Sequence, residues 1–269
     1  MINSNHIEGS KLTEDQTRLI FETNTIDVGD GVPVDDILET VHHFRAIDYV
    51  IDVAEEELSE EIIKQLHYIL KHDTKDSTLN WFAVGDYKRR ANMVGGRETV
   101  KPKDVASQMQ TLLMRYNAQS SVTINDVIAL HAEFEYIHPF QDGNGRVGRL
   151  IALKECLRHN IIPFIIEDAK KHYYYRGLSE WRNEKGWLTD TCLDGQDTFI
   201  RLLDMLASQW CVGFCHHALC FYIAYLDRPF HFFCSSMTLL IAAGSSCIMF
   251  SSPRIETRSS FIKTGIFKA

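Results

Sequence analysis

The sequence predicts an all-α fold, a helical bundle with one small β-hairpin. Three observations indicate it. Apolar residues recur at spacings of three and four over residues 34–53, which is the period of an amphipathic helix. Residues typical of helix N-caps precede several such stretches. Between Asn80 and Pro102 the period is lost and three glycines separate short apolar pieces, which favours a hairpin or an irregular flap.

The first part of the chain predicts three helices. Thr13 and Gln16 have the spacing of a capping box, in which each side chain bonds a backbone N–H of the other residue, so a helix is expected to begin there. The second helix covers residues 34–53. Ser59 is the expected start of the third, whose apolar side carries Ile62, Ile63, Leu66, Ile69 and Leu70.

Helical patterns resume after the flap. The expected stretches are residues 103–116, a helix capped by Thr123 or Asn125 that must end near His138, a helix from about Arg146 to about Asn160, and a last pair over about 166–182 and 196–208. The end near His138 is expected because a residue that precedes a proline is disfavoured in helical geometry.

Composition narrows the class of protein. The 269 residues carry a formal net charge of −8, which argues against a nucleic-acid binder, because such a protein shows a basic stripe. The N-terminal stretch MINSNHIEGSKLTEDQ is polar, so no signal peptide is expected. Seven cysteines without a CxxC pair favour reduced thiols and a cytoplasmic location.

The chain changes character near residue 210. The last 59 residues hold only 5 of the 28 Lys and Arg residues and 2 of the 36 Asp and Glu residues. An uncharged run over residues 229–250 is long enough to span a bilayer, but it holds a proline, a histidine and four serines. A membrane hairpin, a buried extension and a segment with no selected role remain open. The loss of amphipathic pattern favours the last, so a membrane association is disfavoured.

The stretch HPFQDGNGRVGR, residues 138–149, combines a base, an acid, a glycine-rich turn and two cations between two expected helices. The backbone N–H groups of Gly143, Asn144 and Gly145 and the first N–H groups of the second helix point into one space and form an anion site. Arg146 and Arg149 are three residues apart and share a helix face. Two arginines at a helix N-terminus suit a polyphosphate group.

Two further side chains of this stretch carry chemistry. Asp142 can hold a divalent cation against phosphates, since hard cations prefer carboxylate and phosphate oxygens. His138 stands just before the turn, where it can take a proton from an incoming hydroxyl. The whole pattern is much more specific than any of its parts.

The stretch resembles the signature of Fic-domain proteins, and every signature position is met. The resemblance extends to His131, Phe134, Ile137 and Leu150, to the KKHYYYRGL stretch and to the GDYKRRANMVGG stretch. It covers about residues 1 to 206. It implies three parts: an inhibitory segment (1–20), a Fic-type helical domain (21–206) that holds the loop 138–149, and a tail of unknown role (207–269).

The resemblance implies a protein adenylyltransferase, which transfers AMP from ATP to a Ser, Thr or Tyr hydroxyl of a target protein. His138 would be the catalytic base, and Asp142 would bind Mg²⁺ or Mn²⁺. Gly143, Asn144 and Gly145 would form the anion hole, while Arg146 and Arg149 would bind the ATP phosphates. The alternatives are a nucleotide-binding regulatory module and a transferase of another phosphate-containing group.

The resemblance also implies a built-in inhibitor and a docking flap. Ser4 to Gly9 match an inhibitory motif of the family, in which Glu8 would pair with Arg149 and block the productive pose of ATP. Gly85, Tyr87, Val94 and Gly95 would belong to the flap that binds the target protein by backbone pairing. The target, any homo-oligomer and any removal of AMP stay open.

Overall fold

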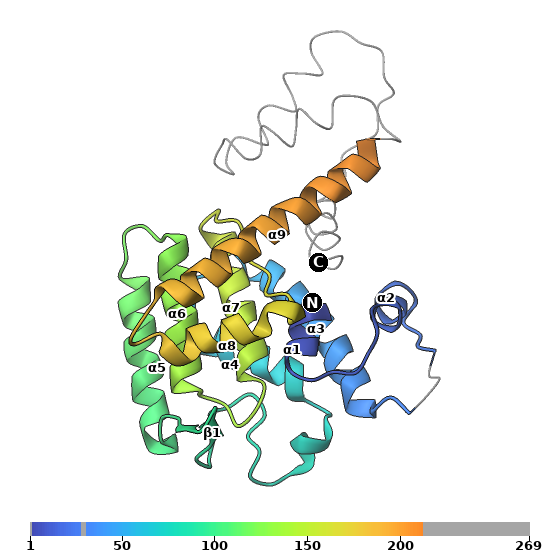
Figure 1. Cartoon of the computed structure of the whole chain (residues 1–269). Helices are drawn as coiled ribbons and strands as arrows, with labels where there is room; N and C mark the ends of the chain where they lie inside the picture. The colour runs from blue at the N-terminus through green and yellow to red at the C-terminus, as the bar shows by residue number, and fades with distance from the viewer. Residues whose placement is uncertain (1, 28–30, 212–269) are drawn as a thin grey trace, which may run out of the picture. The chain divides into compact units, whose positions relative to one another are not determined.

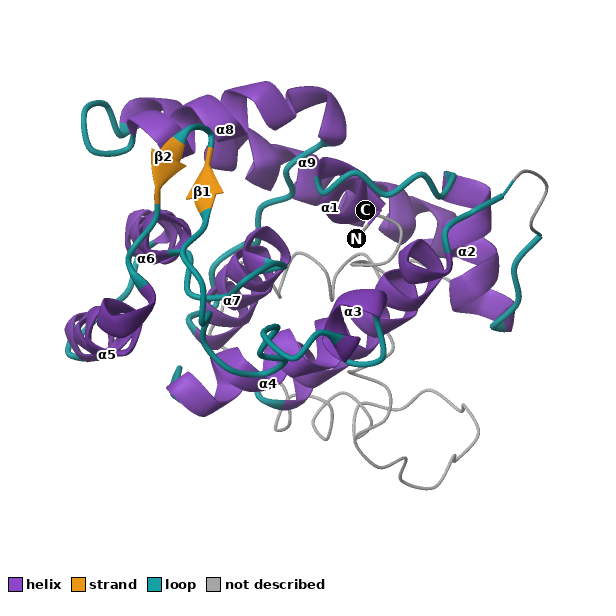
Figure 2. Ribbon diagram, turned by 90° about the horizontal axis from the view of Figure 1, so that it is seen from below, coloured by secondary structure: helices purple, strands orange, loops and turns teal. Residues whose placement is uncertain are grey.

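The computed structural model describes residues 2–27 and 31–211 of the chain. Within this part the structure is mostly helical and has one short antiparallel hairpin, as predicted (Figures 1 and 2). Its helices are α1 (Ile2–Ile7), α2 (Glu14–Thr23), α3 (Val34–Asp52), α4 (Glu60–Lys71), α5 (Pro102–Asn117), α6 (Ile124–Ile137), α7 (Asn144–Arg158), α8 (Lys171–Glu180) and α9 (Gly186–Cys211). The strands are β1 (Met93–Val94) and β2 (Arg97–Glu98), and the 3₁₀ helices are η1 (Lys75–Thr78) and η2 (Asp168–Lys170).

One compact unit covers residues 1–199 and contains the whole signature loop. Helix α7 lies in its interior and packs against α6, α3, α4 and α1. It can do so because its side chains are apolar on more than one face: Val147, Leu150, Ile151, Ala152 and Cys156 are all buried. The first turn of α7, which follows the loop, is therefore held rigidly by the core.

The predicted caps are present. Thr13 Oγ1 accepts a hydrogen bond from Gln16 N, and Thr13 N donates to Gln16 Oε1, which completes the capping box of α2. Ser59 caps α4. Of the two candidates for α6, the N-cap is Thr123, and its N–H donates to the Asp126 carboxylate. Local capping chemistry thus set these helix starts correctly.

Three helices have bounds that differ from the sequence-based expectation, and one helix was not expected from the pattern. Helix α7 starts at Asn144 and not near Arg146, because Gly143 takes the N-cap position in the left-handed region, with φ 76°. Helix α8 is shorter than 166–182, and α9 begins ten residues before the expected 196. Residues 2–7 form a helix that the polar pattern did not suggest.

The helix expected to begin at residue 196 in fact continues through Gly195. A glycine normally weakens a helix, but this one lies inside α9, where a Cβ atom would meet the backbone oxygen of Ile165 at 2.6 Å. Ile165 N also donates to Gly195 O at 3.1 Å. The glycine therefore marks a close backbone crossing and not the boundary of a helix.

Among the described residues, no helix combines the length and the apolar character that a membrane crossing requires. The uncharged run at 229–250, on which the membrane prediction depended, lies outside the described residues.

Candidate active site

The signature loop begins where α6 ends. His138 is the C-cap of α6 and has left-handed backbone angles, φ 52° and ψ 63°. Its N–H donates to Phe134 O at 2.8 Å. Left-handed geometry is uncommon for a residue with a side chain, and here Pro139 prevents the helix from continuing. The backbone thus turns sharply at His138 itself.

The loop is closed by Asn144. Its side-chain oxygen accepts from Phe140 N at 2.8 Å, and its side-chain nitrogen donates to Phe140 O at 2.9 Å. Phe140 is fully buried, as expected, and its ring stacks on His67 at 4.0 Å. The Asn144 side chain is therefore used to hold the loop, and its backbone N–H is the group that remains available to an anion.

The N-terminus of α7 faces the N-terminal segment of the chain. The first N–H groups of a helix have no acceptor within the helix and attract negative charge. The Glu8 carboxylate lies over this turn so closely that a Cβ atom at position 145 would collide with its Oε1. Gly145 thus leaves the space that Glu8 occupies, and a carboxylate already lies in the predicted anion site.

Arg149 is shared between Glu8 and Ser4. Its Nη2 donates to Glu8 Oε1 at 2.7 Å and to Ser4 O at 3.1 Å, while Nε donates to Ser4 Oγ at 2.9 Å. The predicted pairing of Glu8 with Arg149 is present and uses one oxygen of the carboxylate. Ser4 takes the second donor of the guanidinium.

Helix α1 is fixed to the domain by a second set of contacts. Asn5 is 5% exposed; its Nδ2 donates to Thr40 Oγ1 at 3.1 Å, and its Oδ1 pairs with His43 Nδ1 at 2.7 Å. Ile7 is buried in a cluster with Ile128 and other apolar side chains. Glu8 is therefore held in place by a docked helix.

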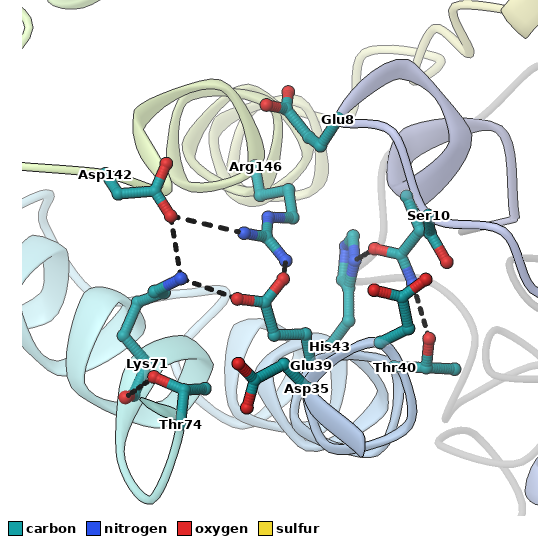
Figure 3. Close-up of polar contacts among 12 residues, drawn as sticks. Glu8, Ser10, Asp35, Glu39, Thr40, His43, Lys71, Thr74, Asp142 and Arg146 are labelled. Carbon is teal, nitrogen blue, oxygen red and sulfur yellow. Dashed lines mark hydrogen bonds and ion pairs between the residues drawn. The ribbon is translucent and has the colours of Figure 1, made fainter. Parts of the chain in front are cut away.

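A network of four charged side chains lies on the other side of the α7 N-terminus (Figure 3). Lys71 Nζ donates to Asp142 Oδ2 at 2.7 Å and to Glu39 Oε1 at 2.5 Å. The other oxygen of Glu39 accepts from Arg146. Sequence reasoning predicted Asp142 and Arg146 but missed Glu39 and Lys71, because both belong to ordinary amphipathic helices far from the loop.

Asp142 is negatively charged over the physiological pH range. Burial acts to raise its pKa, but the charge of Lys71 and then that of Arg146 outweigh this effect and lower the pKa to about 2. Its side chain is 51% exposed. The described residues contain no group of three His, Cys, Asp or Glu that could hold a metal ion. Asp142 is thus a single ionised carboxylate, paired with Lys71 and open to solvent on one side.

His138 is neutral at physiological pH. Burial, followed by the nearby charge of Lys88, lowers its pKa to about 4. Its Nδ1 lies 3.7 Å from Glu135 Oε2, too far for a hydrogen bond. The neutral imidazole is the form that accepts a proton, and the lowered pKa makes His138 a weaker base than a free histidine.

The flap segment is anchored to the loop by Lys88, another residue that the sequence did not reveal. Lys88 N donates to Pro139 O at 2.8 Å, and its buried Nζ donates to His138 O at 2.7 Å. Asn92 Nδ2 adds a bond to Phe140 O at 3.1 Å. His138 and the flap segment are thereby tied together.

The four predicted flap residues have two different environments. Val94 and Gly95 lie at the exposed tip of the hairpin. Gly85 and Tyr87 instead contact α4: Gly85 N donates to His67 Nδ1 at 2.9 Å, and Lys64 Nζ lies 4.4 Å from the centre of the Tyr87 ring. Of these four residues, Val94 and Gly95 are exposed, whereas Gly85 and Tyr87 are partly buried against α4.

Fold and loop together define a helical domain with an anion site at a buried helix N-terminus, covered by a glutamate from a docked N-terminal helix. Residues 57–156 match the model of the Fic/DOC family. This part of the chain is therefore similar to the family that the sequence resemblance named.

The relatives agree with this assignment. The chain is 31% identical over 178 residues to "Protein adenylyltransferase Fic" of Drosophila yakuba and of Drosophila melanogaster, an alignment that covers 64% of this chain. It spans about a third of their length, 34% and 35% respectively.

Two solved structures have the same fold. A Fic-domain-containing signalling protein from Bacteroides thetaiotaomicron matches with a TM-score of 0.60 and 27% identity, over 73% of this chain and 75% of that one. A fragment of Fic-1 from C. elegans matches with a TM-score of 0.63 and 21% identity, over 74% and 59%.

Proposed function

We propose that this chain is a protein adenylyltransferase that transfers AMP from ATP to a hydroxyl group of a target protein, and that Glu8 inhibits it. The observation that carries the proposal is the arrangement around the α7 N-terminus. A neutral histidine, a carboxylate and two arginines surround one anion site, and this site already holds the carboxylate of Glu8. The name printed for the Drosophila relatives supports the same activity.

The reaction assigns a step to each group. The hydroxyl oxygen of the target attacks the α-phosphorus, the bond to the bridging oxygen of the β-phosphate breaks, and pyrophosphate leaves. His138 takes the proton of the hydroxyl. The backbone N–H groups of Gly143, Asn144 and Gly145 and the side chains of Arg146 and Arg149 stabilise the phosphate charge. Mg²⁺ or Mn²⁺ held by Asp142 would neutralise charge on the departing pyrophosphate.

The role of Glu8 follows from competition for Arg149. The guanidinium that should hold the terminal phosphate is bound to Glu8 and Ser4, and the Glu8 carboxylate repels a phosphate from the same turn. ATP that enters beside Glu8 would therefore bind in a pose unsuited to in-line attack. The hairpin tip at Val94 and Gly95 is the part of the flap that we assign to target docking.

The test compares native protein with Glu8→Gly, each incubated with a cell lysate and with ATP labelled at either the α- or the γ-phosphate. Label on protein from the α-phosphate, together with a mass increase of one AMP, is the expected result. Label from the γ-phosphate would show that another phosphate-containing group is transferred. ATP binding without any transferred label, in both forms, would favour the regulatory module.

A further inference from the structure

Lys71 lies beside the signature loop although it belongs to the C-terminal end of α4. Its side chain is only 2% exposed. The aliphatic stem lies against Gly143, where a Cβ atom would meet Lys71 Cδ at 3.5 Å. The ammonium group is thereby placed between the carboxylates of Asp142 and Glu39 (Figure 3). Lys71 therefore adds a buried positive charge at the N-cap of α7, next to the predicted anion site.

Glu39 bridges two cations with its two oxygens. One oxygen accepts from Lys71 and the other from Arg146, whose side chain is 5% exposed. Burial opposes the ionised form of Glu39, but Arg146 and Lys71 outweigh it and lower the pKa. Two oxygens on one centre that bridge an ammonium and a guanidinium reproduce the way in which a phosphate would bind there.

The cluster has an unfilled donor and space beside it. Arg146 Nε is buried and has no hydrogen-bond partner among the described residues. A polar cavity of about 70 Å³ adjoins Glu39 and is lined by Ser10, Thr40 and Arg146, among others. The Glu39 side chain therefore has room to turn away from the two cations when a stronger anion arrives.

We propose that Lys71 is a polyphosphate-binding residue outside the signature loop, and that Glu39 occupies a phosphate position between Lys71 and Arg146 until the nucleotide enters. This inference rests on the proposed function, because it concerns the same anion site. It concerns Arg146 and the carboxylate of Glu39 on α3, whereas the Glu8 contact concerns Arg149 and the N-terminal segment.

The charge balance predicts the effect of each change. With Glu39, Asp142, Lys71 and Arg146 all ionised, these four side chains balance in charge, and Asp76 Oδ2, 3.9 Å from Lys71 Nζ, adds one negative charge. Glu39→Gln leaves an excess positive charge among the four and removes the competitor, so the affinity for inorganic pyrophosphate should rise by about ten- to a hundredfold. Lys71→Met removes one ligand of the phosphate and should lower this affinity by about tenfold or more.

The experiment is titration calorimetry with inorganic pyrophosphate in the presence of EDTA, so that no metal contributes. Lys64→Met is the matched control: Lys64 is also on α4 and pairs with Glu60 and Asp86, outside the cluster. It should leave the affinity unchanged. The double variant Glu39→Gln/Lys71→Met should lose the gain of Glu39→Gln. Thermal unfolding of each variant reports whether it is folded.

A purely structural cluster gives a different result. If Lys71 serves only to neutralise Asp142, Lys71→Met would bind Mn²⁺ more tightly and leave the pyrophosphate affinity unchanged, which would overturn the proposal. If Lys71→Met does not fold, Glu39→Gln decides alone: an unchanged or weaker pyrophosphate affinity would overturn the assignment of Glu39.

The two proposals fail in different ways. In one outcome the pyrophosphate affinity shifts as predicted, but Glu8→Gly transfers no AMP. This result would contradict the proposed function and leave the inference about Lys71 and Glu39 standing. Normal AMP transfer, with equal pyrophosphate affinity in native protein, Glu39→Gln and Lys71→Met, would contradict the inference alone. A failure of native protein and Glu39→Gln to bind either pyrophosphate or ATP would contradict both.

Discussion

The two arginines of the loop lie one turn apart on α7, and each is bound by a different glutamate from the N-terminal part of the chain. Arg149 is held by Glu8, which directly follows α1, together with Ser4 of α1. Arg146 is held by Glu39 of α3, in a cluster with Lys71 and Asp142. The Arg149 side is formed by a peripheral helix of six residues, whereas the Arg146 side belongs to the helical core.

We infer that the α1 contact is the more detachable of the two. Helix α1 has six residues and is held by the polar contacts of Asn5 and by the buried Ile7. Glu39 cannot leave with α3, since α3 packs against both α4 and α7. Release of Arg149 therefore suits regulation by movement of a helix, while release of Arg146 requires only a rotation of one side chain.

The largest expected effect is that of His138→Ala. His138 is part of neither the Arg149 side nor the Arg146 side. Loss of a general base should reduce AMP transfer by about a hundred- to ten-thousandfold. ATP affinity should stay nearly constant, because the phosphate contacts come from α7. Transfer rates and ATP titration on the Glu8→Gly background measure both quantities. Parallel loss of binding and transfer would count against a role in proton transfer.

Removal of the metal site tests the Arg146 side. Asp142→Ala, or EDTA with the unchanged residue, should lower transfer by at least about a hundredfold, because a bound metal supplies several kcal/mol of charge stabilisation. Adding Mg²⁺ or Mn²⁺ back should restore AMP transfer by the protein with the native Asp142, but not by the Asp142→Ala variant. Undiminished transfer in EDTA would refute the metal requirement.

Glu8→Gly tests the Arg149 side. A charge-assisted Glu–Arg contact is worth about 1.5–3 kcal/mol, so its release should raise AMP transfer by roughly ten- to a hundredfold. The gain should vanish in the double variant with Arg149→Ala. Glu14→Gly, which removes an exposed carboxylate that pairs with Arg18 on α2, is the control and should give no gain. A Glu8→Gly protein no faster than native would mean that no such inhibition exists.

The comparison also shows what the sequence could and could not predict. Glu8 was found because Ser4 and Glu8 form a local pattern, and Asp142, Arg146 and Arg149 because the loop is contiguous. Glu39 and Lys71 have no such signal, since their meeting depends on how α3 and α4 pack against α7.

Features of the backbone could likewise be predicted where they depend on neighbouring residues, and not where they depend on a distant contact. Caps at Thr13, Ser59 and Thr123 depend on neighbouring residues and were predicted, apart from the choice between Thr123 and Asn125. The position of Gly195 inside α9 depends on a close approach of Ile165, which comes from a distant part of the chain. Tertiary contact of this kind is invisible to a local pattern.

Acid should lower the free energy of unfolding, because buried histidines lie on both sides of the site. Burial, and then Lys71, lowers the pKa of His67 to about 3, while burial and then Arg149 lower that of His131 to about 3. Both are neutral when folded, yet they titrate near 6.5 when unfolded. The unfolded state then binds more protons between pH 6.5 and 3, so stability is full above 6.5 and falls as pH drops.

The expected slope is up to about 1.4 kcal/mol per pH unit for each buried histidine, with His138 as a third, while Glu135, whose pKa burial raises to about 8, contributes a slope of the opposite sign. Urea unfolding at pH 7.5, 6 and 5 measures it. His131→Gln should remove the contribution of one histidine and leave that of His67. A free energy of unfolding that does not change between pH 7.5 and 5 would contradict the assignment of two buried neutral histidines.

The smallest expected effect is that of removing the tail. Every residue assigned to the site lies within residues 1–149. Over residues 186–205, where burial in α9 is described, the buried residues Leu188, Cys192, Gly195 and Thr198 all precede residue 199. A chain that ends after residue 206 keeps these contacts, so we expect an unchanged melting temperature and unchanged ATP affinity. Thermal unfolding and ATP titration of the shortened chain test this. If the shortened chain fails to fold, the C-terminal residues contribute to the core as a buried extension. If it folds but the gain of Glu8→Gly disappears, the C-terminal residues influence the Arg149 side, and the division between a detachable α1 contact and an integral Arg146 cluster would have to include them.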